Sequence, residues 1–157
     1  MRSFRVLRSA RPCQTRVVPE PSSRELQERL RNLLPSGFQV QFDDDVALFA
    51  DYDGETDQCG VLMACAGAFN RLISSAEIEA IGRVLATIED LLGQCPPEDW
   101  KPGVRGFRVL IIECFLELVL PTTPGGQPMV VPRMGPLALK CVPPLWLLPD
   151  PPARSNA

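Results

Sequence analysis

Residues 59–69 read CGVLMACAGAF, an uncharged run that follows directly on the polar segment DYDGETDQ at residues 51–58. Another apolar run, VALFA at residues 46–50, ends where that polar segment begins. Asp-Gly in a short polar segment between two apolar runs is a strong signal for a β-hairpin. We therefore predict strands over residues 39–50 and 60–69, joined by a turn.

Three tetrapeptides of similar composition indicate further strands. They are SFRV at residues 3–6, GFQV at residues 37–40 and GFRV at residues 106–109. Each tetrapeptide places Phe and Val two residues apart, so in a strand both side chains point to one face while Arg or Gln points to the other. The third tetrapeptide lies in a long apolar segment rich in β-branched residues, residues 104–120, which we predict to be a strand of the same sheet.

Two segments carry the repeat of an amphipathic helix. Residues 22–34 begin with Ser22 and Glu25, three positions apart, which is the spacing of a capping box, and Ser74 and Glu77 have the same spacing at the start of residues 74–93. In both segments apolar residues recur every three or four positions, so they lie on one side of the helix, which we expect to be buried in the core. These residues are Leu26, Leu30, Leu33 and Leu34 in the first helix, and Ile78, Ile81, Leu85, Ile88 and Leu92 in the second.

The predicted order is strand, helix, strand, strand, helix, strand. That order is typical of the ferredoxin-like split βαβ sandwich, an α+β fold with two helices on one face of an antiparallel sheet. Residues 128–131 and 137–142 are predicted as weaker strands that extend the sheet. We therefore predict a single α+β domain over residues 1–142, followed over residues 143–157 by an extended proline-rich tail in which Trp146 docks on the domain.

Charge is distributed unevenly along the chain. Residues 1–19 carry five arginines and no acid, residues 20–99 carry five arginines against sixteen acids and so have net charge −11, and residues 100–157 have net charge +3. The arginine-rich start is read either as a first strand with solvated arginines, which we favour, or as a mitochondrial transit peptide. No apolar run is long enough for a membrane span and the start lacks a signal-peptide core, so we expect an intracellular protein with no membrane partner.

Asp51 and Asp53 followed by Gly resemble the nucleophile loop of haloacid-dehalogenase-type phosphatases. Glu55, however, stands where that family has threonine, and a calcium-loop alignment would place Phe49 at the first ligand position. The chain has no histidine, the commonest general base, and no glycine-rich phosphate-binding loop. We therefore predict no catalytic residue, no cofactor and no enzyme activity, and interpret the acids of residues 43–57 as a solvated surface.

The cysteines and the predicted sheet exclude two further classes of site. The six cysteines lack the CxxC spacing of a zinc site, so we predict no metal and interpret them as reduced and mostly buried thiols. They are Cys13, Cys59, Cys65, Cys95, Cys114 and Cys141. The run at residues 59–69 has one aromatic residue and no base, and the middle of the chain is acidic, so we do not expect binding of nucleic acid.

Four segments resemble adenovirus early-region-four proteins of the 34-kilodalton family. They are RVVPEPSSRELQERLRNLLP, CGVLMACAGAF, RGFRVLII and MVVPRMGPLALKC, and the resemblance spans residues 16–142. This chain is much shorter than the 34-kilodalton protein and lacks its Cys/His-rich segments, so no zinc-dependent property is carried over. The resemblance implies a small regulatory protein of a DNA virus that acts in the host nucleus or cytoplasm by recruiting host proteins.

Leu110, Cys114 and Leu118 have the spacing of an elongin-C-binding box, which would make a ubiquitin-ligase component a partner. Val109 stands before Leu110 where such boxes usually have Ala, Pro, Ser or Thr, and the β-rich composition favours a strand whose residues build the core. We favour the core interpretation and keep these three residues and Trp146 as candidate partner-binding residues.

Three classes of function fit the sequence. The favoured one is a viral early regulatory protein that acts as an interaction adaptor and recruits or sequesters host or viral proteins. The alternative is a bacterial ferredoxin-like domain that senses a ligand or self-associates without catalysis. An enzyme that uses the aspartate cluster is the third.

Overall fold

The computed structural model describes residues 18–120 and 127–147, and these residues form helices and connecting loops without any strand. The predicted α+β ferredoxin-like fold is therefore wrong. The helices are α1 (Ser23–Arg31), α2 (Ser36–Leu48), α3 (Gln58–Ser74), α4 (Ile78–Gln94), the short η1 (Pro97–Trp100), α5 (Phe107–Ile111), the π-helical η2 (Ile112–Leu116), α6 (Glu117–Val119), α7 (Gln127–Val130), η3 (Val131–Arg133), α8 (Pro136–Cys141) and η4 (Pro144–Leu147).

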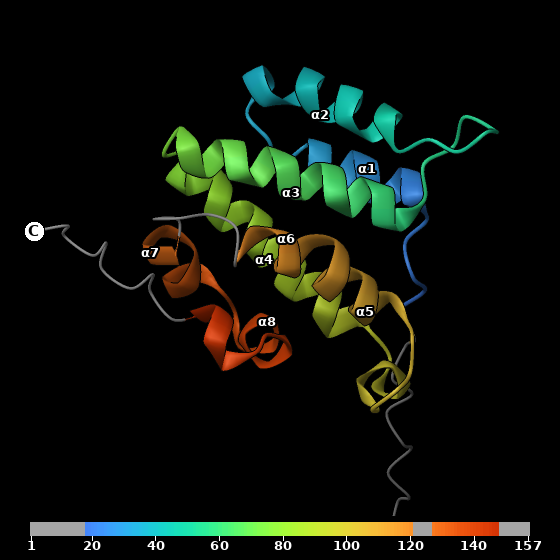
Figure 1. Ribbon diagram of the computed structural model, residues 1–157, viewed down its shortest axis with the longest axis vertical. Helices are drawn as coiled ribbons and strands as arrows, with labels where there is room; N and C mark the ends of the chain where they lie inside the picture. The colour runs from blue at the N-terminus through green and yellow to red at the C-terminus, as the bar shows by residue number, and fades with distance from the viewer. Residues whose placement is uncertain (1–17, 121–126, 148–157) are drawn as a thin grey trace, which may run out of the picture.

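Helix α3 lies at the centre of the fold, between α1 and α2 on one side and α4 and the α5–α6 segment on the other (Figure 1). Ten of its 17 residues are buried. The Asp57 side chain caps its start by accepting a hydrogen bond from the Gly60 amide at 2.8 Å. Residues 60–69 were predicted as a strand because a helix that is buried on most sides reads as one continuous apolar run, as a buried strand does.

Residues 107–119 form one helical segment, α5, η2 and α6, where the sequence predicted a strand. Phe107, Ile111, Phe115 and Val119 are buried and four residues apart, the spacing of one side of a helix. The Phe115 ring packs edge-to-face on the Phe69 ring of α3, with 5.4 Å between centroids. Tertiary packing of this kind overrides the modest helix propensity of the β-branched residues in the segment.

Other predicted strands are also helical. The tetrapeptide at residues 37–40 lies in α2, whose Phe42 and Val46 are buried. Residues 128–131 and 137–142 lie mainly in α7, η3 and α8. The tetrapeptide at residues 3–6 lies outside the described residues.

The two predicted helices exist. The Ser22–Glu25 capping box is confirmed: the Glu25 amide donates to Ser22 Oγ at 3.2 Å, and the Ser22 amide donates to Glu25 Oε2 at 2.8 Å. The second predicted box is wrong, because Ser74 ends α3 and α4 begins at Ile78 without a side-chain cap. Most of the predicted apolar residues of both helices are buried, with Leu33 and Ile78 half-buried against the same core.

The C-terminal helices pack against α4 (Figure 1). Glu89 of α4 accepts hydrogen bonds from the amides of Leu137 and Ala138 at 2.8 and 2.9 Å, and so caps the start of α8. The prediction of an extended tail is wrong for its described part, residues 143–147, which contains η4; Trp146 of η4 is half-buried against the core. Among the described residues, no helix is both long and apolar enough to cross a membrane.

Candidate functional site

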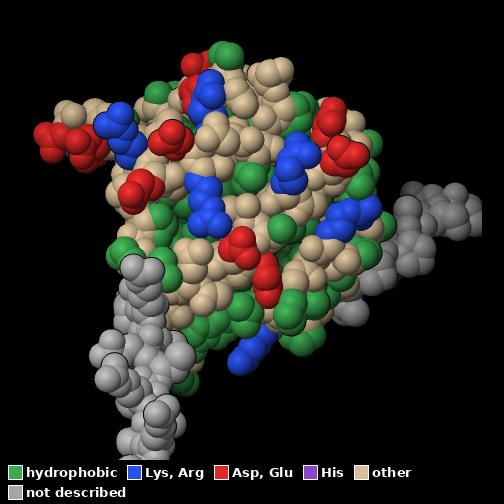
Figure 2. Space-filling model, turned by 180° about the vertical axis from the view of Figure 1, so that it is seen from behind, with side chains coloured by type: hydrophobic (Ala, Val, Ile, Leu, Met, Phe, Trp, Pro, Cys, Tyr) green, Lys and Arg blue, Asp and Glu red, His purple; other side chains and the backbone are tan. Residues whose placement is uncertain are grey.

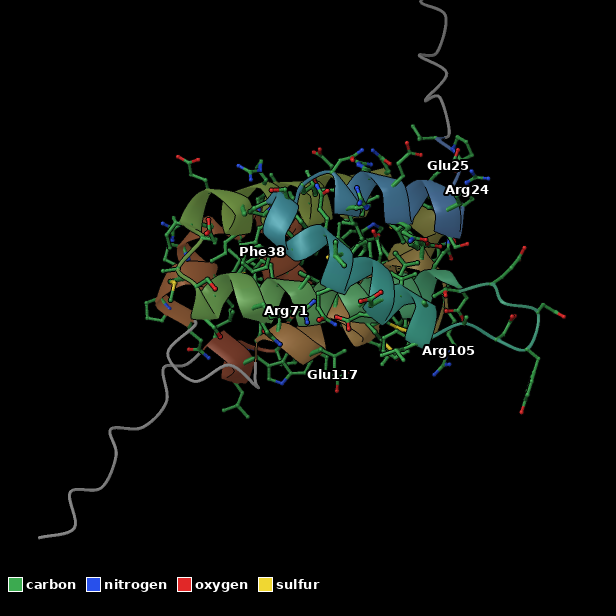
Figure 3. All side chains as sticks on the ribbon, turned by 90° about the horizontal axis from the view of Figure 1, so that it is seen from above. Arg24, Glu25, Phe38, Arg71, Arg105 and Glu117 are labelled. Carbon is green, nitrogen blue, oxygen red and sulfur yellow. A yellow bond between two sulfur atoms is a disulfide. The ribbon has the colours of Figure 1, made fainter. Side chains whose placement is uncertain are left out.

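Helix α2 has apolar residues on two opposite sides. On its inner side Phe42 and Val46 are buried against α1 and α3, while on its outer side Val40 and Leu48 expose 68% and 80% of their surface. Seen from above, α2 lies across α1 and α3 as the outermost layer of the molecule (Figure 3). A surface helix ordinarily has one apolar side, so the second apolar side is the feature that core packing does not explain.

The residues of that second side share one helical face. Val40, Asp44 and Leu48 are four residues apart and Ala47 is exposed beside Leu48. We call these four residues the α2 outer face. With 13 residues, α2 is about 20 Å long at 1.5 Å per residue.

Three polar contacts fix α2 on the helices beneath it. Asp43 accepts from Arg31 Nε of α1 at 2.8 Å, and Asp45 accepts from an Arg71 guanidinium nitrogen of α3 at 2.8 Å. Figure 3 shows Arg71 on α3, alongside α2. Gln39 Nε2 donates to the Leu34 carbonyl oxygen at 3.0 Å, near the end of α1. These contacts and the buried inner side hold the outer face in place.

The loop between α2 and α3 carries four exposed acids, Asp51, Asp53, Glu55 and Asp57, which we call the acidic tip. The tip projects from the body of the molecule (Figure 1), and its acidic side chains gather at the upper left of the view from behind (Figure 2). The sequence predicted a hairpin turn between strands here and a solvated surface for the acids of residues 43–57. The four acids of the tip are exposed, but Asp43 and Asp45 are half-buried in ion pairs, and the flanking segments are helices.

Local contacts give the acidic tip its shape. Asp51 Oδ1 accepts from the amides of Asp53 and Glu55 at 2.9 and 3.1 Å, and Gly54 adopts a φ of +79°, which favours glycine. Thr56 Oγ1 donates to the Val46 carbonyl oxygen at 2.7 Å and so ties the tip to the end of α2. The Asp51 side chain therefore stabilises a turn.

An open groove of about 540 Å³ lies between the start of α1, the end of α2 and the acidic tip. Arg24 of α1 and Glu55 of the tip are among the charged side chains that line it. It shares Ala47 with the α2 outer face, so groove and face form one continuous surface. Its lining residues are Ser22, Ser23, Arg24, Gln27, Asp43, Val46, Ala47, Ala50, Gly54, Glu55 and Thr56.

The candidate partner-binding residues predicted from the sequence do not lie on α2. They are in α5, η2, α6 and η4. Leu110 is half-buried and lines an open hollow of about 300 Å³ with Arg105 and Glu113. Leu118 is half-buried, and Cys114 is buried with its sulfur bonded to Cys59. The segment is helical, as an elongin-C-binding box requires, but Cys114 is not presented at the surface. Recruitment of a ubiquitin-ligase component through this segment stays a prediction.

The cysteines do not provide a reactive thiol among the described residues. Cys59 and Cys114 form a disulfide between α3 and η2, so the prediction of reduced thiols is wrong for these two. Burial raises the pKa of Cys65 to about 12, and burial together with the nearby Asp99 carboxylate raises the pKa of Cys95 to about 11. Burial also raises the pKa of Cys141, although its contact with Arg108 acts in the opposite direction. Nucleophilic cysteines need a lowered pKa, so these thiols favour a structural role.

Exchanging Asp51 and Asp53 for asparagine is expected to change the free energy of unfolding by no more than about 0.5 kcal/mol. Both side chains are exposed, and an asparagine amide oxygen at position 51 still accepts the two turn hydrogen bonds. Millimolar magnesium or calcium should not raise the melting temperature of either protein beyond an ionic-strength effect. A metal-induced rise in the wild type that the double variant lacks would contradict this expectation.

No group of three or more histidine, cysteine, aspartate or glutamate residues is placed to hold a metal ion within residues 18–120 and 127–147.

The chain matches no protein-family model, no curated protein and no solved structure. The resemblance to adenovirus early-region-four proteins therefore stays a prediction from the four sequence segments.

The α2 outer face was missed at the level of sequence. The available signal was the pair Val40 and Leu48, which stand eight residues apart and so fall on the side of a helix opposite Phe42 and Val46. That signal appears only once residues 36–48 are read as a helix.

Proposed function

We propose that the chain is a small regulatory protein of the viral early type that acts as an interaction adaptor and has no catalysis of its own. It binds host proteins in the host nucleus or cytoplasm through the α2 outer face and the adjoining α1–α2 groove. The observation that carries this proposal is the exposure of Val40 and Leu48 on a helix whose inner side is already buried.

Physical considerations support a binding role for this surface. Moving apolar side chains out of water lowers the free energy, so exposed apolar side chains on one face of a fixed helix can form part of a contact surface. The ion pairs of Asp43 with Arg31 and of Asp45 with Arg71 hold α2 in place before a partner arrives, which lowers the ordering cost of binding.

The alternative, a ferredoxin-like sensing domain, rested on a sheet that the described residues lack. The α1–α2 groove is open to solvent rather than enclosed, whereas pockets for small ligands usually enclose most of the ligand surface. The geometry therefore favours a macromolecular partner over a small ligand.

Affinity purification from mammalian cells with quantitative mass spectrometry tests the adaptor proposal. The wild-type chain is compared with a Val40→Ser, Leu48→Ser double variant and with Leu145→Ser, a control at an apolar residue of η4 that exposes 73% of its surface. We expect a set of host proteins that the double variant loses and the control retains. Identical protein sets for the wild type and the double variant would rule out the α2 outer face as the contact surface.

A further inference from the structure

We propose that the α2 outer face binds a basic amphipathic helix, with apolar residues on one side and lysine or arginine on its flanks. This inference rests on the proposed adaptor function and names the chemistry of the partner. The apolar residues of α2 supply the contact, and the acids beside them determine the charge that the partner carries.

The apolar part of the face suits helix-on-helix packing. Val40 and Leu48 are separated by two turns, about 12 Å along the helix axis. Ala47, beside Leu48, is small enough to let a second helix approach closely, as interdigitating side chains require. A partner helix can place large apolar residues against Val40 and against Leu48, with a lysine or arginine opposite Asp44 between them.

All the charged residues of α2 and of the loop that follows it are negative, although Arg24 of α1 lines the adjoining groove. Residues 36–57 contain seven acids and no lysine or arginine. Within the described residues, ion pairs involve only two of these acids, Asp43 and Asp45. Asp44 lies between Val40 and Leu48, and the acidic tip follows the C-terminal end of α2, where the helix dipole also favours cations. A partner with cations is therefore complementary to α2 and the acidic tip.

A second copy of the chain is a poorer occupant of the same face. A two-fold symmetric contact centred on α2 would bring Asp44 of each copy toward Asp44 of the other. No basic residue between positions 36 and 57 would compensate that repulsion. The charge pattern thus favours a basic partner over self-association.

Fluorescence anisotropy with labelled model peptides tests the inference on the full chain. The probe is a synthetic leucine–lysine peptide about as long as α2, with leucines placed to form one side of a helix. Its control has every lysine replaced with glutamate. We expect the lysine peptide to bind and the glutamate peptide to bind at least about tenfold more weakly, with lysine-peptide affinity falling as salt is raised.

Protein variants locate the binding site. Val40→Ser with Leu48→Ser, and separately Asp44→Asn with Asp53→Asn, should each weaken lysine-peptide binding by about tenfold or more. Leu145→Ser is the matched apolar control, and Glu79→Gln with Glu117→Gln is the charge control, because these residues are exposed on other elements. The controls should bind like the wild type. Melting curves establish that every variant is folded.

Three outcomes overturn the inference. They are equal binding of the two peptides, unchanged binding by the α2 variants, and a wild-type dimer in light scattering that Leu48→Ser dissolves. The first two outcomes leave the adaptor proposal standing if the α2 double variant still loses host proteins in cells. The partner is then not a basic amphipathic helix. Failure of both experiments removes the adaptor proposal as well.

Discussion

Replacing Phe115 with alanine is expected to lower the free energy of unfolding by about 3–5 kcal/mol. The side chain is completely buried, and its ring contacts the Phe69 ring edge-to-face with 5.4 Å between centroids. The substitution removes that aromatic contact and leaves a cavity between η2 and α3 that the surrounding helices fill only in part. Urea denaturation followed by circular dichroism measures the loss.

Such a loss is a large part of the 5–15 kcal/mol that stabilises a typical domain, so Phe115→Leu is the second variant if the alanine protein does not fold. It keeps most of the apolar volume and should cost less than the alanine variant. Tyr52→Ala is the aromatic control, because Tyr52 in the loop between α2 and α3 is fully exposed and its loss should change stability by no more than about 0.5 kcal/mol. Equal effects at Phe115 and Tyr52 would contradict the packing of η2 on α3.

Helix α1 was predictable because the relevant physics is local. Ser22 and Glu25 satisfy each other's backbone amides three residues apart, and Leu26 and Leu30 repeat on one side of a helix whose other side is polar. Neither the cap nor the repeat depends on distant parts of the chain. The same repeat identified α4, although its start could not be placed, because Ser74 belongs to the preceding helix.

Helix α3 could not be predicted from periodicity. Its polar residues are few because neighbours cover it on several sides, so residues 59–69 show neither the period of a strand nor that of a surface helix. Residues 104–120 were misread for a related reason. There the β-branched residues suggested a strand, although Phe107, Ile111 and Phe115 already stood at helical spacing.

Helix α2 was misread because of its second apolar side. Phe38, Val40 and Phe42 alternate with Gln39 and Gln41, which is the pattern of a half-buried strand. In the helix Phe42 is buried while Val40 is exposed, so the alternation comes from apolar residues on two opposite sides. Val40, whose place in the alternation suggested a strand, therefore belongs to the candidate site. Sequence reasoning is expected to fail where function overrides the ordinary pattern.

The anchors of the candidate site required the tertiary structure. Asp43 and Asp45 meet Arg31 and Arg71, which stand 12 and 26 residues away along the chain. The sequence indicated an acidic surface but not which of its acids are paired. Only the tertiary structure shows which acids form ion pairs. It also shows that the remaining acids, Asp44 and the acidic tip, border the exposed apolar residues.

Removing the disulfide between Cys59 and Cys114 is the second change with a large expected effect. The bond joins residues 55 positions apart, and closing a loop of that length lowers the entropy of the unfolded chain by an amount worth about 4 kcal/mol. A Cys59→Ala, Cys114→Ala double variant should lose about that much stability relative to the oxidised wild type. Cys95→Ala, at a half-buried free thiol, is the control and should lose less.

Reducing the wild-type disulfide measures the contribution of the bond to stability without replacing the two cysteine side chains. Dithiothreitol should lower the urea midpoint of the wild type toward that of the double variant and leave the midpoint of the double variant unchanged, with peptide mapping by mass spectrometry to establish the Cys59–Cys114 linkage. Free thiols at both positions in the untreated protein, or a midpoint that does not respond to the reductant, would contradict the disulfide.

The result also bears on the proposed action in the nucleus or cytoplasm, because these reducing compartments keep most thiols free. In such a compartment η2 must be held on α3 by packing alone, which makes the contact between Phe69 and Phe115 more important for stability. The α2 outer face does not depend on the bond, because α2 is held by Arg31 of α1 and Arg71 of α3. Reduction should therefore lower the stability of the protein without changing its affinity for the basic peptide, provided that the protein stays folded at the assay temperature.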